Sequence, residues 1–153
     1  MTFQLNLETE PIARISAHEP ICVAPSTAVQ SVIETMQTDA SGSVLVCEDE
    51  KLVGILTERD VLKLMGQRAD FQAPVQQVMT ANPVTVAKGD TVGKAIQLMA
   101  GGGYRRIPIV DGSKPMGVLL ASDVLHYLVE HFPEFVYNLP PAPHHATQQR
   151  EGA

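Results

Sequence analysis

The chain has 153 residues, 44% of them hydrophobic and 18% charged, which is enough to bury a core within one domain or two closely packed halves. A net charge of −6, with no basic run longer than Arg105 and Arg106, argues against a nucleic-acid-binding protein. No apolar stretch approaches the ~18 residues of a membrane span and no leader pattern is present, so we expect no membrane association and a cytoplasmic location.

Residues 20–66 carry the pattern of one β-α-β-β-α unit, preceded by a lead-in over residues 1–19 with a short helix expected at 12–15. Apolar residues at 3.6-residue spacing mark its helices, and β-rich runs between polar turns mark its strands. In chain order we expect a strand at 21–23, a helix capped by Thr27, strands at 43–47 and 52–56, and a helix over 57–66.

Residues 67–82 are expected to form a linker with one short helix at 74–79. Residues 83–131 then repeat the order, with a strand at 84–86, a helix at 91–100, strands at 106–110 and 116–120, and a helix at 121–129. The remaining residues, 132–153, are proline-rich and then polar, and we expect this tail to be partly disordered.

The two units are copies of one another. Residues 20–62 align without a gap on residues 83–125, at an offset of 63 residues, and 12 of the 43 pairs are identical. A repeat of this length is typical of a supersecondary unit that cannot bury its apolar face alone. We therefore predict an α+β fold in which two pseudo-symmetric units pack together and leave a cleft between them.

Catalytic and metal-binding patterns are not evident. Cys22 and Cys47 lie in expected strands and are interpreted as small buried thiols, without metal spacing or a redox partner. His126 and His131 are five residues apart, which is the wrong spacing for metal ligands on one helix face. We therefore predict no enzyme activity, no catalytic residues, no metal site and no catalytic cofactor.

A strand that runs into a helix at Thr57 carries the sharpest local signal, Thr57-Glu58-Arg59-Asp60. Thr57 and Asp60 resemble a capping box, which is a purely structural explanation. In the second copy Leu120 replaces the threonine and cannot cap through its side chain, yet Asp123 is retained. We interpret this as a use of the carboxylate beyond pairing with the cap.

A carboxylate at the start of a helix suits the two hydroxyls of a ribose, and the neighbouring amides can face a phosphate. Arg105 and Arg106, on an expected strand, would supply a cation, unless both are simply solvated. Three consecutive glycines, residues 101–103, are better explained as a helix stop than as a ligand-binding loop.

Several motifs together resemble a tandem cystathionine-β-synthase (CBS) domain pair. They are the two Gly-apolar-apolar-x-x-x-Asp strings, the strand 106–110, the segment 78–86 and the 63-residue period. The resemblance covers residues 11–129. It implies two β-α-β-β-α repeats packed through their sheets into one module, adenine nucleotides bound in clefts between the repeats, and dimers of such modules.

Two unequal clefts are implied by the resemblance. In the first, Thr57 and Asp60 would bind ribose and phosphate, with the strand 21–23 and Val44 near the base. In the second, Asp123 would bind the ribose, with Val84 and Thr85 near the base and Arg106 toward the phosphate. Each cleft departs from the family pattern at one position. In the first, Ser43 occupies the position equivalent to Arg106, so the strand cation is missing. In the second, Leu120 replaces the threonine hydroxyl. Arg105 or Arg106 could instead serve a phosphate bound at Asp60. The implied nucleotide-binding residues are Ile21, Val23, Val44, Thr57, Asp60, Val84, Thr85, Tyr104, Arg105, Arg106, Pro108 and Asp123.

The expected function is a regulatory, non-catalytic module that binds an adenosine-containing ligand such as AMP, ADP or ATP and signals nucleotide state to an unidentified effector protein. A homodimer is expected through the helical faces of Val32 and Met36 and of Ala95 and Met99. The alternative is a dimerisation or interaction scaffold of the same fold whose clefts bind no nucleotide.

Overall fold

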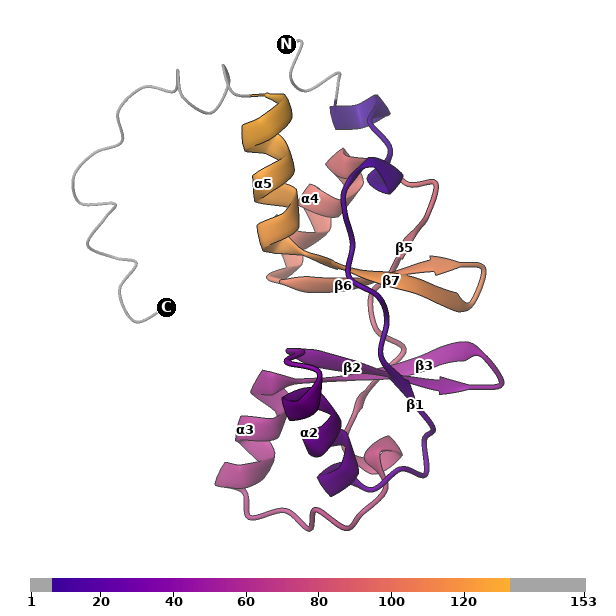
Figure 1. Cartoon of the computed structure of the whole chain (residues 1–153), viewed down its shortest axis with the longest axis vertical. Coiled ribbons are helices and arrows are strands. Elements are labelled where there is room, and N and C mark those ends of the chain that lie inside the picture. Colours follow the sequence, from indigo (N-terminus) through magenta and orange to yellow (C-terminus); the bar gives the residue numbers. More distant parts are fainter. Residues whose placement is uncertain (1–6, 133–153) are drawn as a thin grey trace, which may run out of the picture.

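The computed structural model describes residues 7–132, in which two β-sheets face each other across the middle of the molecule (Figure 1). Helices α2 (Val29–Thr38) and α3 (Glu58–Gly66) cover the outer face of one sheet, and α4 (Val92–Gly102) and α5 (Ala121–His131) cover the other. The predicted α+β fold with two pseudo-symmetric units packed through their sheets is confirmed.

The first sheet has the strand order β1 (Cys22–Val23), β2 (Ser43–Glu48), β3 (Lys51–Thr57) and β4 (Thr80–Ala81). The second has the order β5 (Val86–Ala87), β6 (Arg106–Asp111) and β7 (Lys114–Leu120). In both sheets the first strand runs parallel to the second, and the second and third strands form an antiparallel hairpin. His18 exchanges two backbone hydrogen bonds with Val118, and so takes beside β7 the place that β4 takes beside β3.

Three local expectations differ from the structure. Helix α2 begins at Val29 with Ala28 as its N-cap, and not with Thr27, whose own N–H closes a turn to the carbonyl of Ala24. Strand β5 begins at Val86 rather than at residue 84, and Pro83 and Val84 before it line a cleft instead. The short helix expected at 74–79 is a 3-10 helix, η2 (Val75–Gln77), and β4 follows it without having been predicted.

The lead-in packs on the second repeat, and the linker packs on the first. Ile12, in the 3-10 helix η1 (Ile12–Arg14), donates its N–H to the Asp90 carbonyl of the second repeat at 2.9 Å. Val75 donates in the same way to Thr27 of the first repeat at 2.7 Å. Both pairs obey the 63-residue offset, so each repeat lends its first segment to the core of the other.

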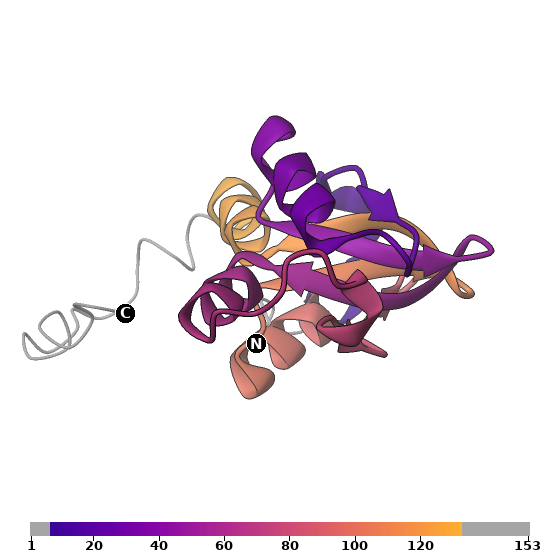
Figure 2. The same cartoon turned by 90° about the horizontal axis from the view of Figure 1, so that it is seen from below.

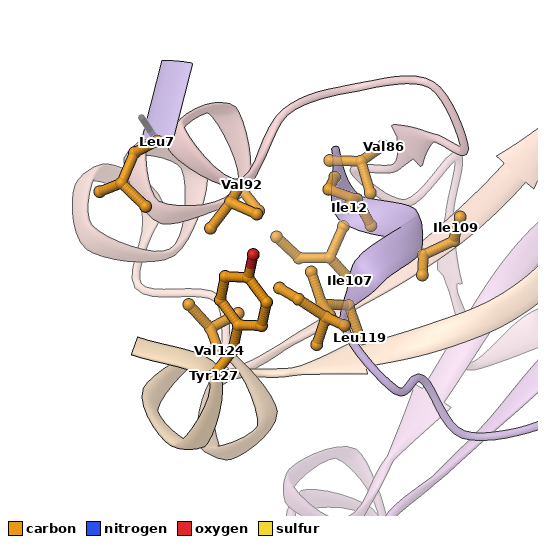
Figure 3. Packing of buried hydrophobic residues seen from close by; sticks show 11 residues of the cluster. Leu7, Ile12, Val86, Val92, Ile107, Ile109, Leu119, Val124 and Tyr127 are labelled. Atoms are coloured by element: carbon orange, nitrogen blue, oxygen red, sulfur yellow. The ribbon is translucent and has the colours of Figure 1, made fainter. Parts of the chain in front are cut away.

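This exchange is visible in the core of the second half, where Ile12 and Leu7 lie among side chains of β5–β7, α4 and α5 (Figure 3). Ile12 is 1% exposed and Val75, in the core of the first half, is 0% exposed. Burial of such side chains stabilises each half by about 2–3 kcal/mol per residue. Each half of the structure therefore combines one repeat with the segment that precedes the other repeat in the sequence.

A third apolar cluster, Leu45, Ile55 and Val118 with Leu120 packed against it, joins the inner faces of the two sheets. The β2–β3 and β6–β7 hairpins point to the same side, as the views in Figures 1 and 2 agree. At their turns Leu52 donates its N–H to Ser113 at 2.9 Å. These contacts fix how the two halves face each other, and with that the shape of any cleft between them.

Two groups of side chains lie elsewhere than expected. Cys22 is exposed on β1 and Cys47 is half-buried on β2, so the interpretation of both as buried thiols is wrong. Val32, Met36 and Ala95 are buried in the two cores, so the helical faces expected to form a dimer point inward.

Candidate functional site

The start of α3 is held by a complete capping box. Asp60 Oδ2 accepts from the Thr57 N–H at 2.9 Å and from the Thr57 hydroxyl at 3.0 Å, and Thr57 Oγ1 accepts from the Asp60 N–H at 3.4 Å. The structural explanation of this motif is therefore satisfied. Both side chains are half-buried, and both also line the cleft described below.

The second copy shows why Asp123 does not need a hydroxyl partner. Its Oδ2 accepts from the Leu120 N–H at 3.2 Å, and the same oxygen lies 3.2 Å from Nε2 of His18. A carboxylate at this position caps the helix through the backbone alone. The retention of Asp123 is thus explained by a local backbone contact and by His18.

A cleft of about 580 Å³ opens between the two halves. Its walls come from the junction of β3 and α3, from the linker around β4, and from the end of α4 with the start of β6. The volume lies within the range of ligand-binding pockets. The lining residues are Ile55, Thr57, Glu58, Arg59, Asp60, Thr80, Pro83, Val84, Gly103, Tyr104, Arg105, Arg106 and Pro108.

Seven of the residues implied by the family resemblance meet in this one cleft: Thr57, Asp60, Val84, Tyr104, Arg105, Arg106 and Pro108. Their expected partition was wrong, because Val84 and Arg106 lie with Asp60 and not with Asp123. Val84 lies with Asp60 because the chain that follows β4 passes the start of α3 on its way to the second half. The expectation that Arg105 or Arg106 reaches the Asp60 site agrees with this geometry.

The other five implied residues lie outside the lining of this cleft. Val44 is fully buried in the core of the first half, and Ile21 and Val23 pack against that core. Thr85 is half-buried just before β5. Asp123 lines a separate, smaller cleft of about 310 Å³ together with Arg14, His126 and His131.

Six lining residues were not predicted, namely Ile55, Glu58, Arg59, Thr80, Pro83 and Gly103. Glu58 and Arg59 stand within the string that drew attention to Thr57 and Asp60, but only a fold can show which way their side chains point. Gly103 has φ +73° and caps α4, as the helix-stop interpretation expected, and it also borders the cleft.

One ion pair crosses the cleft and joins the two halves. Arg106 Nη2 lies 3.2 Å from Glu58 Oε1, with the Arg106 side chain 28% exposed and that of Glu58 65% exposed. Gly42 makes room for this pair, because a Cβ there would lie 2.6 Å from Cζ of Arg106 and 2.9 Å from Glu58 Oε1. The guanidinium thus lies against the backbone before β2.

Charge and shape together define what the cleft can bind. Three arginines and two carboxylates line it, along with the apolar surfaces of Ile55, Val84 and Pro108. Such a site offers acceptors for hydroxyl groups, cations for an anionic group and a flat apolar wall for a ring. The described residues 7–132 contain no group of three or more side chains suited to holding a metal ion.

A second, apolar hollow of about 420 Å³ lies between α4 and α5. Met99, Leu125 and Leu128 are among its lining residues, and Leu125 is 60% exposed. Among the helices of the described part of the chain, none is long and apolar enough to cross a membrane.

Comparison with known proteins matches both repeats to one family. The sequence profile of the CBS domain matches residues 12–67 and 75–130, two ranges that differ by the same 63 residues. The CBS domain-containing protein YhcV of Bacillus subtilis is 34% identical over 103 residues, which is 67% of this chain and 74% of that protein. The chain spans 43%, 73% and 74% of the lengths of three curated relatives.

Solved structures share the fold at lower identity. The CBS domain protein PAE2072 from Pyrobaculum aerophilum, complexed with AMP, has a TM-score of 0.69 and 21% identity, covering 78% of this chain and 98% of that one. The CBS domain pair of protein MJ0100, in complex with 5-methylthioadenosine and S-adenosyl-L-methionine, has a TM-score of 0.72 and 18% identity, covering 80% and 98%.

Proposed function

The chain belongs to the CBS-domain family and contains two tandem repeats, and from its cleft we propose a regulatory, non-catalytic module that binds an adenosine-containing ligand. The observation that carries the proposal is the meeting of Asp60 and Arg106, from different repeats, in one cleft of about 580 Å³. Neither repeat alone builds this site. A ligand that fills it therefore stabilises one arrangement of the two halves.

Each part of the ligand has a counterpart in the cleft. The Asp60 carboxylate, held at the start of α3, accepts hydrogen bonds from the ribose hydroxyls. The apolar surfaces of Val84 and Pro108 contact the base, and Arg106 faces the phosphate. The same fold holds AMP in PAE2072 and 5-methylthioadenosine with S-adenosyl-L-methionine in MJ0100, which supports this ligand class.

Calorimetry with AMP, ADP, ATP and S-adenosylmethionine tests the proposal. We expect Asp60→Ala and Arg106→Ala each to weaken nucleotide binding about tenfold or more, because each removes a charge-assisted hydrogen bond of ~1.5–3 kcal/mol. Asp60→Asn retains the size of the side chain and separates a folding defect from a binding defect. Asp39→Ala, at an exposed position outside the cleft, is the matched control. Unchanged affinity in both cleft variants would contradict the assignment.

Signalling requires a partner, and we propose that the module forms a homodimer in the cytoplasm that presents its ligand state to an effector protein. Leu62 and Met65 on α3 and Leu125 on α5 are more than half exposed, at 68%, 51% and 60%. The two helices lie on the same side of the molecule (Figures 1 and 2). We assign the dimer interface to this exposed surface, since the faces of α2 and α4 expected from the sequence point inward.

A scaffold without a nucleotide site is the second candidate function. Two observations favour it, since Arg106 already has a carboxylate partner in Glu58 and Asp60 already caps α3. A thermal-shift screen separates the two, because a ligand at 100 times its Kd adds about 2.7 kcal/mol of stability. A shift with any adenosine compound favours the sensor, and none with all of them favours the scaffold.

A further inference from the structure

We propose that Glu58 is a charge selector of the cleft, which favours adenosine derivatives with at most one phosphate and disfavours ADP and ATP. The inference rests on the proposed nucleotide-binding function and specifies the ligand class for that site. Its basis is the position of Glu58, which stands at the first residue of α3 and projects a carboxylate toward the cation that a phosphate would need.

Arg106 is engaged before any ligand arrives. Its Nη2 lies 3.2 Å from Glu58 Oε1, and Gly42 lets the guanidinium lie close against the backbone in this position. A phosphate that approaches Arg106 must either take the guanidinium from Glu58 or share it with a neighbouring negative charge. The guanidinium fork can serve two acceptors, so one phosphate is tolerated.

The backbone at this helix start is also largely engaged. The Glu58 N–H donates to the Gly42 carbonyl at 3.0 Å, and the Asp60 N–H donates to Thr57 Oγ1 at 3.4 Å. Amides that usually receive a phosphate at a helix N-terminus therefore already have acceptors. This start of α3 is poorly suited to a chain of phosphates.

The balance of charge points the same way. Arg59, Arg105 and Arg106 line the cleft together with Glu58 and Asp60, so the lining carries three positive and two negative charges. With Asp60 on the ribose and Glu58 on Arg106, the remaining cations are sufficient for one phosphate dianion. Each further phosphate adds negative charge within reach of Glu58, and like charges at short range repel.

The selector arises from the differences between the two repeats. At the 63-residue offset, Glu58 corresponds to Ala121, Arg106 to Ser43 and Arg105 to Gly42. The carboxylate, the guanidinium and the glycine that accommodates them therefore meet in only one of the two pseudo-equivalent places of the described chain. Their combination is a property of this cleft and not of the repeat.

The test uses calorimetric titration of adenosine, AMP and ATP into the full chain and its Glu58→Gln variant. In the unmodified protein we expect AMP to bind more tightly than ATP. In Glu58→Gln, ATP affinity should rise about fivefold or more, AMP affinity should rise less, and adenosine affinity should stay the same. The fivefold figure corresponds to one pair of like charges near 4 Å in water, about 1 kcal/mol.

Glu34→Gln on α2 is the matched control, since it changes net charge equally at an exposed site outside the cleft and should leave all three affinities unchanged. Equal changes for adenosine and ATP in Glu58→Gln, or none, would overturn the charge selector and leave the proposed function standing. Failure of the unmodified protein to bind any of the three compounds at millimolar concentration would overturn the proposed function, and the selector with it.

Discussion

At the scale of single residues, the two cysteines show how much the reactivity of a thiol depends on its burial. Cys22 lies on the edge strand β1 and is exposed, whereas Cys47 is half-buried on the adjacent strand β2. Burial, together with the hydrogen bond and charge of Cys22, raises the pKa of the Cys47 thiol to about 12. A thiol with so high a pKa is protonated throughout the neutral range and is a poor nucleophile.

Alkylation should therefore distinguish the two. At pH 8 we expect iodoacetamide to label Cys22 well before Cys47, of which only about one molecule in ten thousand is a thiolate at that pH. Peptide mass mapping over a time course measures both rates. In a Cys22→Ser variant Cys47 should remain slow, because burial is the first cause of its raised pKa. Equal labelling rates at both positions would count against this account.

At the scale of elements, the exchange of the segments before β1 and before β5 links the two repeats. Ile12 completes the core of the half built from the second repeat, and Val75 completes the core of the first. Each segment is anchored by two backbone hydrogen bonds that obey the repeat offset, Ile12 to Asp90 and Val92 to Glu10 in the second half. Stability of one half thus depends on residues that lie next to the other in sequence.

Hydrogen exchange should reveal this crossed dependence. We expect Ile12→Ala to lower the free energy of unfolding by about 2–4 kcal/mol, because it opens a cavity in a core where Ile12 is 1% exposed. Faster amide exchange should appear in α4 and β5–β7, far along the chain, more than in α2 and β2. Val75→Ala should give the opposite pattern.

Arg14→Ala, on the same 3-10 helix but with a side chain 67% exposed, is the control and should change stability by less than about 0.5 kcal/mol. Exchange that rises mainly in the half following Ile12 in sequence would show that the lead-in is not part of the second core.

At the scale of the whole molecule, apolar side chains remain exposed on one side. Leu62 and Leu125 occupy equivalent positions of the two repeats, on α3 and α5, and the apolar hollow between α4 and α5 adjoins Leu125. A pseudo-symmetric pair of apolar positions suits a symmetric interface, in which the same surface of a second copy covers both.

Sedimentation velocity tests this surface. We expect the unmodified protein to sediment as a dimer and the double variant Leu62→Asp with Leu125→Asp to sediment as a monomer, because two buried carboxylates would face each other across the interface. Met116→Asp, at a position 50% exposed on β7, is the control and should leave the dimer intact. A dimer that persists in the double variant would place the interface elsewhere.

The equivalence of the two segments that precede the aligned repeats was not predicted, although the sequence contains a signal for it. Pro11-Ile12 matches Pro74-Val75 at the 63-residue offset, and Ile15 matches Val78, so the repeat begins nine residues before the aligned stretch. Such short matches become persuasive only once the two segments are seen to dock in equivalent ways. Strand β4 is different, because a two-residue edge strand carries no periodicity from which to predict it.

The fold and the start of α3 were predictable from the sequence. Apolar period and turn chemistry are local properties that one repeat confirms in the other, and the capping box of Thr57 and Asp60 is local as well. Which residues share a cleft depends instead on how the two halves pack together. Glu58 and Arg106 are 48 positions apart and meet because the two sheets pack face to face. No local pattern encodes such a distance, because it is set by the packing of Ile55, Val118 and their neighbours between the sheets.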